Sequence, residues 1–261
     1  MNEEKITLPQ KLDIKLDDRL RCAASFVRCG SVAADVGTDH AYLPIFLTVN
    51  GICPRAVGSD INEGPINRAR ENVDKYGLGD RITLIHTDGL RGLESTGAKD
   101  IIICGMGGEM IIDIIRNAQF VFSGDARLIL QPMTKQAKLR QYLTESGFAI
   151  EDERLVKSGG KLYQCICASW RGTESALAAG VPTELTPASL TQYSAVELLL
   201  GRANIERGET GDGLFTDFID KVIGAKTKQL NGKISGNANI EKEHALLGKL
   251  KEIKDEIGRN I

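Results

Sequence analysis

The spacing of hydrophobic positions changes several times along the chain and divides it into predicted elements. Apolar residues at helical spacing predict a first helix over residues 11–29. Short apolar runs then alternate with helical segments at about 41–50, 64–76, 107–118 and 135–146. We interpret the apolar runs as strands at residues 31–36, 55–60, 81–86, 100–104 and 127–131. Strands alternating with helices of this length predict a parallel sheet with right-handed crossovers.

The pattern changes after the last of these helices. Two strand-like runs, 148–157 and 161–170, are joined only by Ser158-Gly159-Gly160, which predicts an antiparallel hairpin at one edge of the sheet. Five parallel strands followed by a hairpin are typical of the Rossmann-like sheet of methyltransferases, whereas a dinucleotide dehydrogenase would continue with another βα unit. We therefore expect an α/β fold, with a class I methyltransferase domain over residues 1–170.

The rest of the chain is predicted to be helical. Residues 171–188 are rich in Gly, Ala, Thr and Pro and indicate a linker. Thr186 followed by Pro187 is typical of a helix start, and the helix is expected to run to about Arg207. Two apolar stripes, at 215–234 and 246–257, predict two more helices, with a turn within 231–239. Residues 189–261 should thus form a small, coiled-coil-like helical domain.

Composition excludes some classes of protein and leaves others open. The chain is 42% hydrophobic and 26% charged, with a net charge of −2, which does not favour a nucleic-acid binder but permits a local basic face. It has no apolar run of membrane-helix length and no signal-like N-terminus, so we expect a cytoplasmic protein without a membrane partner. The six cysteines contain no CxxC pair and there are three histidines, so no metal site is expected. Cys165 and Cys167 should face the same side of a strand.

The first candidate motif follows the first strand. A tight turn there lets backbone amides approach a ligand, and Gly37 lacks the Cβ that would block them. A dinucleotide would need GxGxxG for its pyrophosphate, but this segment has one glycine and two acids. S-adenosylmethionine has no phosphate and carries an ammonium and a sulfonium cation, which carboxylates suit better. An ordinary βα turn is the alternative. The candidate donor-binding residues here are Asp35, Gly37, Thr38, Asp39 and His40.

Two more acidic residues follow the second and third strands. Asp60, with Ile61 and Asn62, lies about twenty residues past Gly37, the spacing at which an acid binds ribose hydroxyls. It could instead cap the helix that begins near Gly64. Asp88, followed by Gly89, could bind the amino group of adenine, or it could belong to a plain Asp-Gly turn.

The fourth and fifth strands are followed by glycines and an amide. Three glycines in the run Cys104-Gly105-Met106-Gly107-Gly108 would let a substrate base come close to the methyl donor, unless the run is only a flexible turn. Gln131 can both donate and accept hydrogen bonds, so it could read a base edge, although Pro132 after it equally indicates a simple turn.

These motifs together closely resemble the bacterial tRNA adenine-22 N1-methyltransferase family. The runs from Gly37 to His40 and from Gly105 to Gly108, in this order, are specific to it. The chain departs from many relatives at Met133, Ser158 and Cys104, which affects the rim of the site more than the donor pocket. The matching stretches are 16–20, 34–44, 60–62 with 64–65, 88–90, 104–108, 130–132 and 161–163.

The resemblance implies methylation of nitrogen 1 of an adenine in the D-arm of tRNA. That nitrogen has its own lone pair, so positioning and a preorganised polar site would supply most of the acceleration, and the base would have to be flipped out. Asp39 and His40 are expected beside the reacting atoms and Tyr42 against the base, although His40 could equally cap the next helix. The catalytic set is then Asp39, His40, Gly105, Met106, Gly107 and Gln131. Alternatives are another RNA position, a small-molecule acceptor, or an RNA-binding module that holds the donor without turnover.

The C-terminal helices are predicted to bind the tRNA. Residues 221–261 hold nine Lys and Arg against five Asp and Glu, a local excess of positive charge in a chain of net charge −2. We expect Lys221, Lys226 and Lys228 to contact phosphates, which would make affinity fall as salt rises. A solvated helix pair that stabilises the domain or a dimer is the alternative, and the sequence does not fix the oligomeric state.

Overall fold

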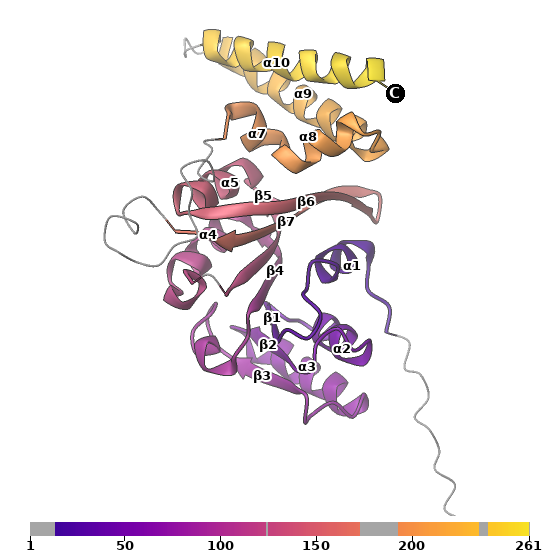
Figure 1. Cartoon of the computed structure of the whole chain (residues 1–261), viewed down its shortest axis with the longest axis vertical. Helices are drawn as coiled ribbons and strands as arrows, with labels where there is room; N and C mark the ends of the chain where they lie inside the picture. Colours follow the sequence, from indigo (N-terminus) through magenta and orange to yellow (C-terminus); the bar gives the residue numbers. More distant parts are fainter. Residues whose placement is uncertain (1–13, 124, 173–192, 235–239, 261) are drawn as a thin grey trace, which may run out of the picture.

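The computed structural model describes residues 14–123, 125–172, 193–234 and 240–260, and its centre is a seven-stranded sheet (Figure 1). The strand order is β3-β2-β1-β4-β5-β7-β6. The first five strands are parallel, whereas β7 is antiparallel to both β5 and β6. The predicted parallel sheet with an edge hairpin is therefore confirmed. The strands are β1 (Ala33–Val36), β2 (Ala56–Asp60), β3 (Ile82–His86), β4 (Asp100–Gly107), β5 (Arg127–Thr134), β6 (Phe148–Ser158) and β7 (Lys161–Trp170).

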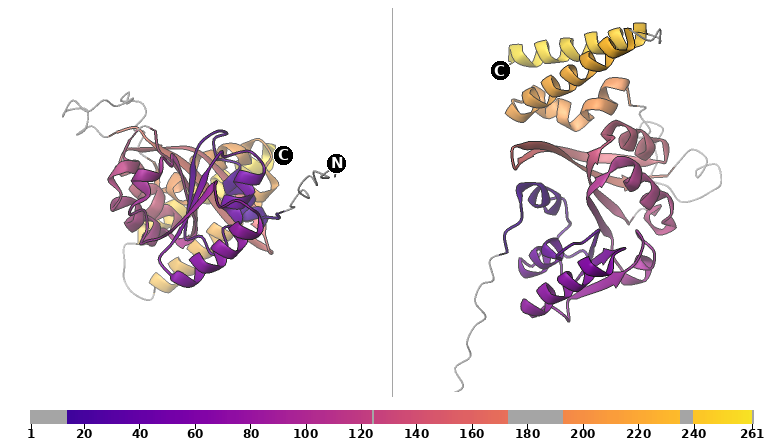
Figure 2. Two further views of the ribbon diagram at one scale, coloured as in Figure 1. Left: turned by 90° about the horizontal axis from the view of Figure 1, so that it is seen from below. Right: turned by 180° about the vertical axis from the view of Figure 1, so that it is seen from behind.

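Helices cover both faces of the sheet (Figure 2). The helices are α1 (Asp18–Ala24), α2 (Tyr42–Val49), α3 (Glu63–Lys75), α4 (Gly108–Arg116), α5 (Gln136–Glu145), α7 (Ala195–Leu200), α8 (Arg202–Glu209), α9 (Gly213–Ile234) and α10 (Ile240–Asn260). Two 3-10 turns, Leu93–Thr96 and Gln119–Val121, flank β4 and α4.

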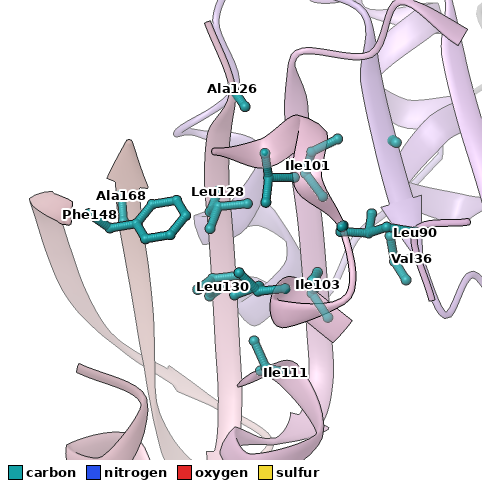
Figure 3. Close-up of a cluster of buried hydrophobic side chains, with 14 of the residues drawn as sticks. Val36, Leu90, Ile101, Ile103, Ile111, Ala126, Leu128, Leu130, Phe148 and Ala168 are labelled. Atoms are coloured by element: carbon teal, nitrogen blue, oxygen red, sulfur yellow. The ribbon is translucent and has the colours of Figure 1, made fainter. Parts of the chain in front are cut away.

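Strands buried on both faces send alternate side chains to opposite cores. Val36, Ile103 and Leu130 belong to the core that α4 and α5 complete (Figure 3). Ala33, Ile102 and Ile129 belong to a second core on the opposite face, under α1 and α2. Cys165 and Cys167 also lie in this second core, which confirms that they share one face of β7. The position of a residue along its strand therefore decides which helices it faces.

The first helix is shorter than the predicted range 11–29. Asp17 caps α1 by accepting a hydrogen bond from the Leu20 amide at 2.7 Å, so the helix begins only at Asp18. It ends at Ala24, and the backbone then turns toward β1. Residues 11–13 lie outside the described part of the chain. The prediction failed because Phe26 and Val27, which follow the helix, continue its apolar spacing although they lie in the turn after it.

The fourth and fifth strands are longer than predicted. Met106 pairs with Pro132, and Gly107 pairs with Thr134, with register shifts on either side of Met106. The strands were expected to end at Cys104 and Gln131, and the alternative that the glycine run or Pro132 forms a simple turn is wrong for the residues that extend β4 and β5. Gly105 has φ +79, and its amide donates to the Gln131 side chain instead of to a backbone carbonyl of β5. This bulge lets β4 continue beyond Gly105.

The C-terminal region is helical, but its first helix is not the one predicted. Ser194 caps α7 in a capping box with Glu197, and Gly201 separates α7 from α8. A continuous helix to Arg207 is therefore wrong, and Thr186 and Pro187 lie outside the described residues. The pair formed by α9 and α10 is confirmed, and the two helices run in opposite directions (Figure 1).

The helical region packs on the edge hairpin through a core of its own. This core joins Leu155 of β6 to Leu200, Phe215 and Leu250 of the helices. The division into residues 1–170, a linker and 189–261 stays a prediction, because its boundary falls within 173–192, which the structure does not describe. No helix in the described ranges combines the length and apolar character that crossing a membrane requires.

Candidate active site

Side chains at the ends of β1, β4 and β5 meet on the face that α1 covers. Asp35, Cys104 and Gln131 alternate with the residues of the other core, so all three point toward α1. Arg19 of α1 reaches them. Its Nη1 donates to Gln131 Oε1 at 2.9 Å, and the Gly105 amide donates to the same oxygen at 3.1 Å. Desolvation raises the pKa of the Cys104 thiol, so it stays neutral beside this network.

Arg19 is the member of this network that motif reasoning missed. Its guanidinium also lies 6.0 Å from the centre of the Tyr163 ring and 3.4 Å from Asp17 Oδ2. Arg19 and Tyr163 both fall in stretches that resemble the tRNA methyltransferase family, 16–20 and 161–163, and this was the only available signal. A helix that precedes the first strand gives no other indication that its side chains reach the strand ends.

Asp35 is a buried carboxyl with a raised pKa. It is 9% exposed, and burial raises its pKa to about 6. The Thr38 side chain and the positive charge of Arg19 favour the ionised form, while the charge of Asp60 opposes it. The ends of β1 and β2 thus place two carboxyls close enough to influence each other.

The turn after β1 is shaped by Gly37 but not by free amides. Gly37 has φ +80, and a Cβ there would collide with the Met106 methyl group. The amides of Gly37 and Thr38 both donate to the Ser59 carbonyl at 2.8 Å. The end of β2 already uses these two amides, so the approach of backbone amides to a ligand stays a prediction for the rest of this turn.

Asp60 keeps one oxygen available at the end of β2. Its Oδ1 accepts from the Asn62 amide at 2.7 Å and from Asn62 Nδ2 at 3.2 Å. Its Oδ2 has no hydrogen-bond partner in the ranges that the structure covers. Asn62, not Asp60, is the N-cap of α3. Ile61 next to it is largely exposed, and its carbonyl lies 2.8 Å from His86 Nε2.

Asp88 and Gly89 border a groove beside α4. The Thr87 amide donates to the Asp60 carbonyl at 2.9 Å, which ties this segment to the end of β2. Asp88 is exposed, and Gly89 lies against Ile114 of α4. The groove has a volume of about 790 Å³, and its lining includes Asp88, Gly89, Met110 and Phe120. Of the predicted donor-binding residues, the groove borders only those that follow β3.

Asp39, His40 and Tyr42 form a separate group on the surface. Asp39 pairs with Arg68 of α3, and its Oδ2 lies 3.2 Å from His40 Nε2. The His40 ring stacks on Tyr42, with centroids 5.1 Å apart and an interplanar angle of 13°. The N-cap of α2 is Ala41 and receives no side-chain bond, so His40 does not cap this helix. No hydrogen bond or ion pair in the described residues joins this group to Arg19, Asp35 or Gln131.

Gln131, which is predicted to read a base edge, makes hydrogen bonds within the protein. Its side chain is fully buried, Oε1 accepts from Arg19 and Gly105, and Nε2 donates to the Pro132 carbonyl at 3.3 Å. A buried amide must satisfy its polar atoms, and here the protein does so. Gln131 therefore holds Arg19 in place in this arrangement, and its direct contact to a base stays a prediction.

Exposed apolar side chains occur after several of the strands. The exposed large hydrophobic side chains in the described residues follow β1, β2 and β4 or end β5. Exposed apolar groups around a polar centre are typical of a ligand site. These side chains are Tyr42, Ile61, Met110 and Met133. Gly105 among them has an exposed backbone, so a flat ring can approach the strand end there.

The predicted RNA-binding lysines lie on α9, far from β1–β3 in Figure 1. Lys226 Nζ is 3.6 Å from Glu243 of α10, so this charge is already partly balanced. Lys221 and Lys228 are exposed. No group of three or more His, Cys, Asp or Glu side chains arranged to hold a metal occurs in the part of the chain that the structure covers.

A family model described as a methyltransferase domain matches residues 16–166. The chain belongs to this methyltransferase family. The prediction of a Rossmann-like methyltransferase is therefore confirmed. The matched range begins just before α1 and includes Arg19, Asp35, Asp60, Gly105 and Gln131, so the network at the strand ends lies within the methyltransferase domain.

A curated relative matches a stretch of about the length of this domain, and two solved structures match nearly the whole chain. The tRNA (adenine(22)-N(1))-methyltransferase of Bacillus subtilis is 35% identical over 156 residues, which are 60% of this chain and 66% of that protein. The match thus spans just under two thirds of the curated relative. The solved structure of the B. subtilis m1A22 tRNA methyltransferase has 26% identity and a TM-score of 0.70, covering 95% of this chain and all of that one. A Streptococcus pneumoniae structure assigned as a tRNA (m1A22) methyltransferase, in complex with S-adenosyl-L-methionine, has 28% identity and a TM-score of 0.72, covering 92% and 98%.

Proposed function

We propose that this methyltransferase transfers a methyl group from S-adenosylmethionine to nitrogen 1 of adenine 22 in the D-arm of tRNA. The observation that carries the proposal is the extent of the structural match. It covers 95% of this chain and 100% of the B. subtilis m1A22 tRNA methyltransferase, and so it includes the C-terminal helices as well as the sheet. A methyltransferase with a different acceptor would need to share only the sheet and its donor site.

The side chains at the strand ends fit the chemical groups of the donor. Arg19 would hold the donor's carboxylate, and ionised Asp35 would face its cationic groups. Asp60 Oδ2 has no protein partner in the described ranges and would accept from the ribose hydroxyls. Ile61 would cover the adenine ring, and Asp88 would accept from its amino group. The acidic character of this set suits a cationic ligand that lacks phosphates.

The protein's contribution to the reaction is positioning. The donor, when bound, supplies a methyl group on a positively charged sulfur. Adenine N1 offers its own lone pair and has no proton to lose, so no residue needs to act as a general base. Gln131 and the Gly105 amide fix the Arg19 guanidinium before any ligand binds, which is preorganisation. Gly105 and Gly107 leave room for the base, and Tyr42 and Met133 offer apolar surface beside it.

The C-terminal helices are proposed to hold the rest of the tRNA. Deleting them would expose the buried face of Leu155 on β6, so substitutions test this better than truncation. We expect the Lys221→Gln/Lys228→Gln double variant to weaken tRNA binding while donor affinity stays unchanged. The log–log salt dependence of tRNA affinity should become shallower by roughly one unit for each lost phosphate contact.

Lys226→Gln is the matched control on the same helix, because Glu243 already balances this charge. It should change tRNA affinity much less than the double variant. If the wild type and the double variant have equal tRNA affinities and equal salt slopes, these helices stabilise the fold and do not bind the tRNA.

The activity itself is tested by transfer of a labelled methyl group. Purified protein is incubated with labelled S-adenosylmethionine and total tRNA, ribosomal RNA or neither. We expect label in the tRNA fraction only. Label in ribosomal RNA or in small molecules would identify a different acceptor, and donor binding without any transfer would favour a binding module over an enzyme.

A further inference from the structure

A buried ion pair lies where the sheet meets the C-terminal helices. Arg140 of α5 and Glu153 of β6 are both fully buried, and Arg140 Nε is 2.6 Å from Glu153 Oε1. Removing two charges from water is costly, and apolar residues of similar size often give equal or greater stability at such sites. The pair is therefore better explained by its other contacts than by a stabilising role.

The guanidinium of Arg140 also holds the end of α7. Its Nη1 donates to the Leu198 carbonyl at 3.0 Å and to the Leu199 carbonyl at 3.4 Å. Its Nη2 donates to Gln164 Oε1 of β7 at 2.5 Å. The last carbonyls of a helix have no partners within the helix and carry partial negative charge, so a buried cation is well matched to them. Arg140 thus connects α5, β6, β7 and the end of α7.

The carboxylate of Glu153 lies against the junction of α7 and α8. Burial raises its pKa, while Arg140 favours the charged form. The Ala203 amide, in the first turn of α8, also favours the charged form, although Glu153 Oε2 makes no hydrogen bond with the described residues. Gly201, between the two helices, has φ +84, and a Cβ there would lie 2.7 Å from the carboxyl carbon of Glu153. Only glycine fits this position without displacing the ion pair.

A second contact between the same elements lies nearer the surface. Arg207 of α8 donates to Asp152 Oδ1 at 2.7 Å and to the Glu153 carbonyl at 3.2 Å. Both side chains are partly exposed, so solvent weakens this pair. Beside the apolar core around Leu155 and Leu200, the contacts of Arg140 and Glu153 are thus the buried polar connection of α7 and α8 to the sheet.

We propose that Arg140, Glu153 and Gly201 are positioning residues for the RNA substrate. They hold the helical region at one fixed angle to the strand ends where methyl transfer takes place. The inference rests on the proposed function, because it requires one RNA to contact both regions. With 22 residues, α9 is about 33 Å long, so a rotation of roughly 10° at its base moves its far end by about 6 Å. A shift of that size would displace phosphates from the lysines while leaving the donor site intact.

The sharpest test replaces the charges and keeps the volume. The Arg140→Met/Glu153→Leu double variant should remain folded at the assay temperature, although Gln164 and the last carbonyls of α7 lose the donor that Arg140 supplies. Its affinity for S-adenosylmethionine should stay within twofold of the wild type. Its dissociation constant for tRNA should rise at least fivefold, and the single-turnover rate at saturating tRNA should fall. A purely stabilising role would affect only the melting temperature and leave tRNA affinity and the rate of the folded protein unchanged.

A matched pair of glycine variants tests the same idea without removing a charge. Gly201 and Gly211 both have positive φ, at +84 and +94, but a Cβ at Gly211 has no atom within 4 Å. Gly201→Ala should weaken tRNA binding at least fivefold, whereas Gly211→Ala, which also places a side chain at a positive φ, should not. If both glycine variants and the double variant bind and methylate tRNA like the wild type, the inference is wrong. A wild-type protein that binds the donor but does not methylate tRNA would contradict the proposed function itself.

Discussion

The raised pKa of Asp35 makes donor affinity depend on pH. Burial raises this pKa to about 6 from an ordinary value of 3.8. A cationic donor favours the ionised carboxylate, so donor binding and loss of the proton are linked. We therefore expect affinity for S-adenosylmethionine to rise between pH 5 and pH 7. Replacing Asp35 with Asn removes the ionisable group and should remove this dependence.

The size of the effect follows from the ionised fraction. With a pKa of about 6, roughly one tenth of Asp35 is ionised at pH 5 and roughly nine tenths at pH 7, so the dissociation constant should fall about tenfold across this range. The free energy of unfolding of the ligand-free protein has the opposite pH dependence and falls as pH rises. The folded state binds the proton more tightly than the unfolded chain, so this group favours folding fully below pH 3.8. About 3 kcal/mol of that contribution is lost as pH rises through 6.

Isothermal titration calorimetry of the donor from pH 5 to pH 7 measures both affinity and proton release. Repeating the titration at pH 6 in buffers of different ionisation enthalpy should show release of about half a proton per donor bound. Imidazoles ordinarily titrate in the same range, so His40→Gln is the control and should keep the wild-type pH dependence. A dissociation constant that does not change with pH, or that changes equally in Asp35→Asn, would refute the assignment of Asp35 to the donor site.

Three further substitutions test the site. Asp60→Ala should weaken donor binding by about 1.5–3 kcal/mol, or roughly tenfold to a hundredfold, because it removes charge-assisted hydrogen bonds to the ribose; unchanged calorimetric affinity in a folded variant would exclude this role. Arg19→Gln should weaken donor binding by a similar amount without unfolding the protein, and a normal dissociation constant would show that Arg19 only supports Gln131. Gly107→Val should abolish transfer to tRNA, since even a Cβ at Gly107 would lie 3.3 Å from Thr134 Oγ1 and a larger side chain would fill the approach of the base; normal turnover would contradict the close approach.

The parallel sheet could be predicted because most of its strands contain a short buried apolar run and the segments between them show helical spacing. Even the terminal hairpin followed from two runs joined by two glycines. The boundaries of the helices could not be predicted from the sequence, because hydrogen bonds from single capping side chains set them. Asp17 begins α1, and Ser194 with Glu197 begins α7. Such caps are common residues in a sequence, and only the surrounding fold decides which of them are used.

The site was predicted in part for a similar reason. Asp35 and Asp60 lie at the ends of the neighbouring strands β1 and β2, so strand order alone brings them together. The role of Gln131 could not be foreseen, because it depends on Arg19 from a helix 112 residues earlier in the chain. Asp39 and His40 are close to Asp35 in sequence, but the turn directs them outward to Arg68 and Tyr42. Adjacency in the chain predicts a shared strand end, but it does not predict the direction of each side chain.

The position of the methyl group on the RNA tests the central claim most directly. A methyl group on nitrogen 1 of adenine blocks the pairing edge, so reverse transcription of tRNA incubated with enzyme and donor should stop beside position 22. The stop should require S-adenosylmethionine and should disappear when adenine 22 is replaced by guanine. A stop at another position, or full-length transcripts together with demonstrated methyl incorporation into the RNA, would contradict the proposed activity.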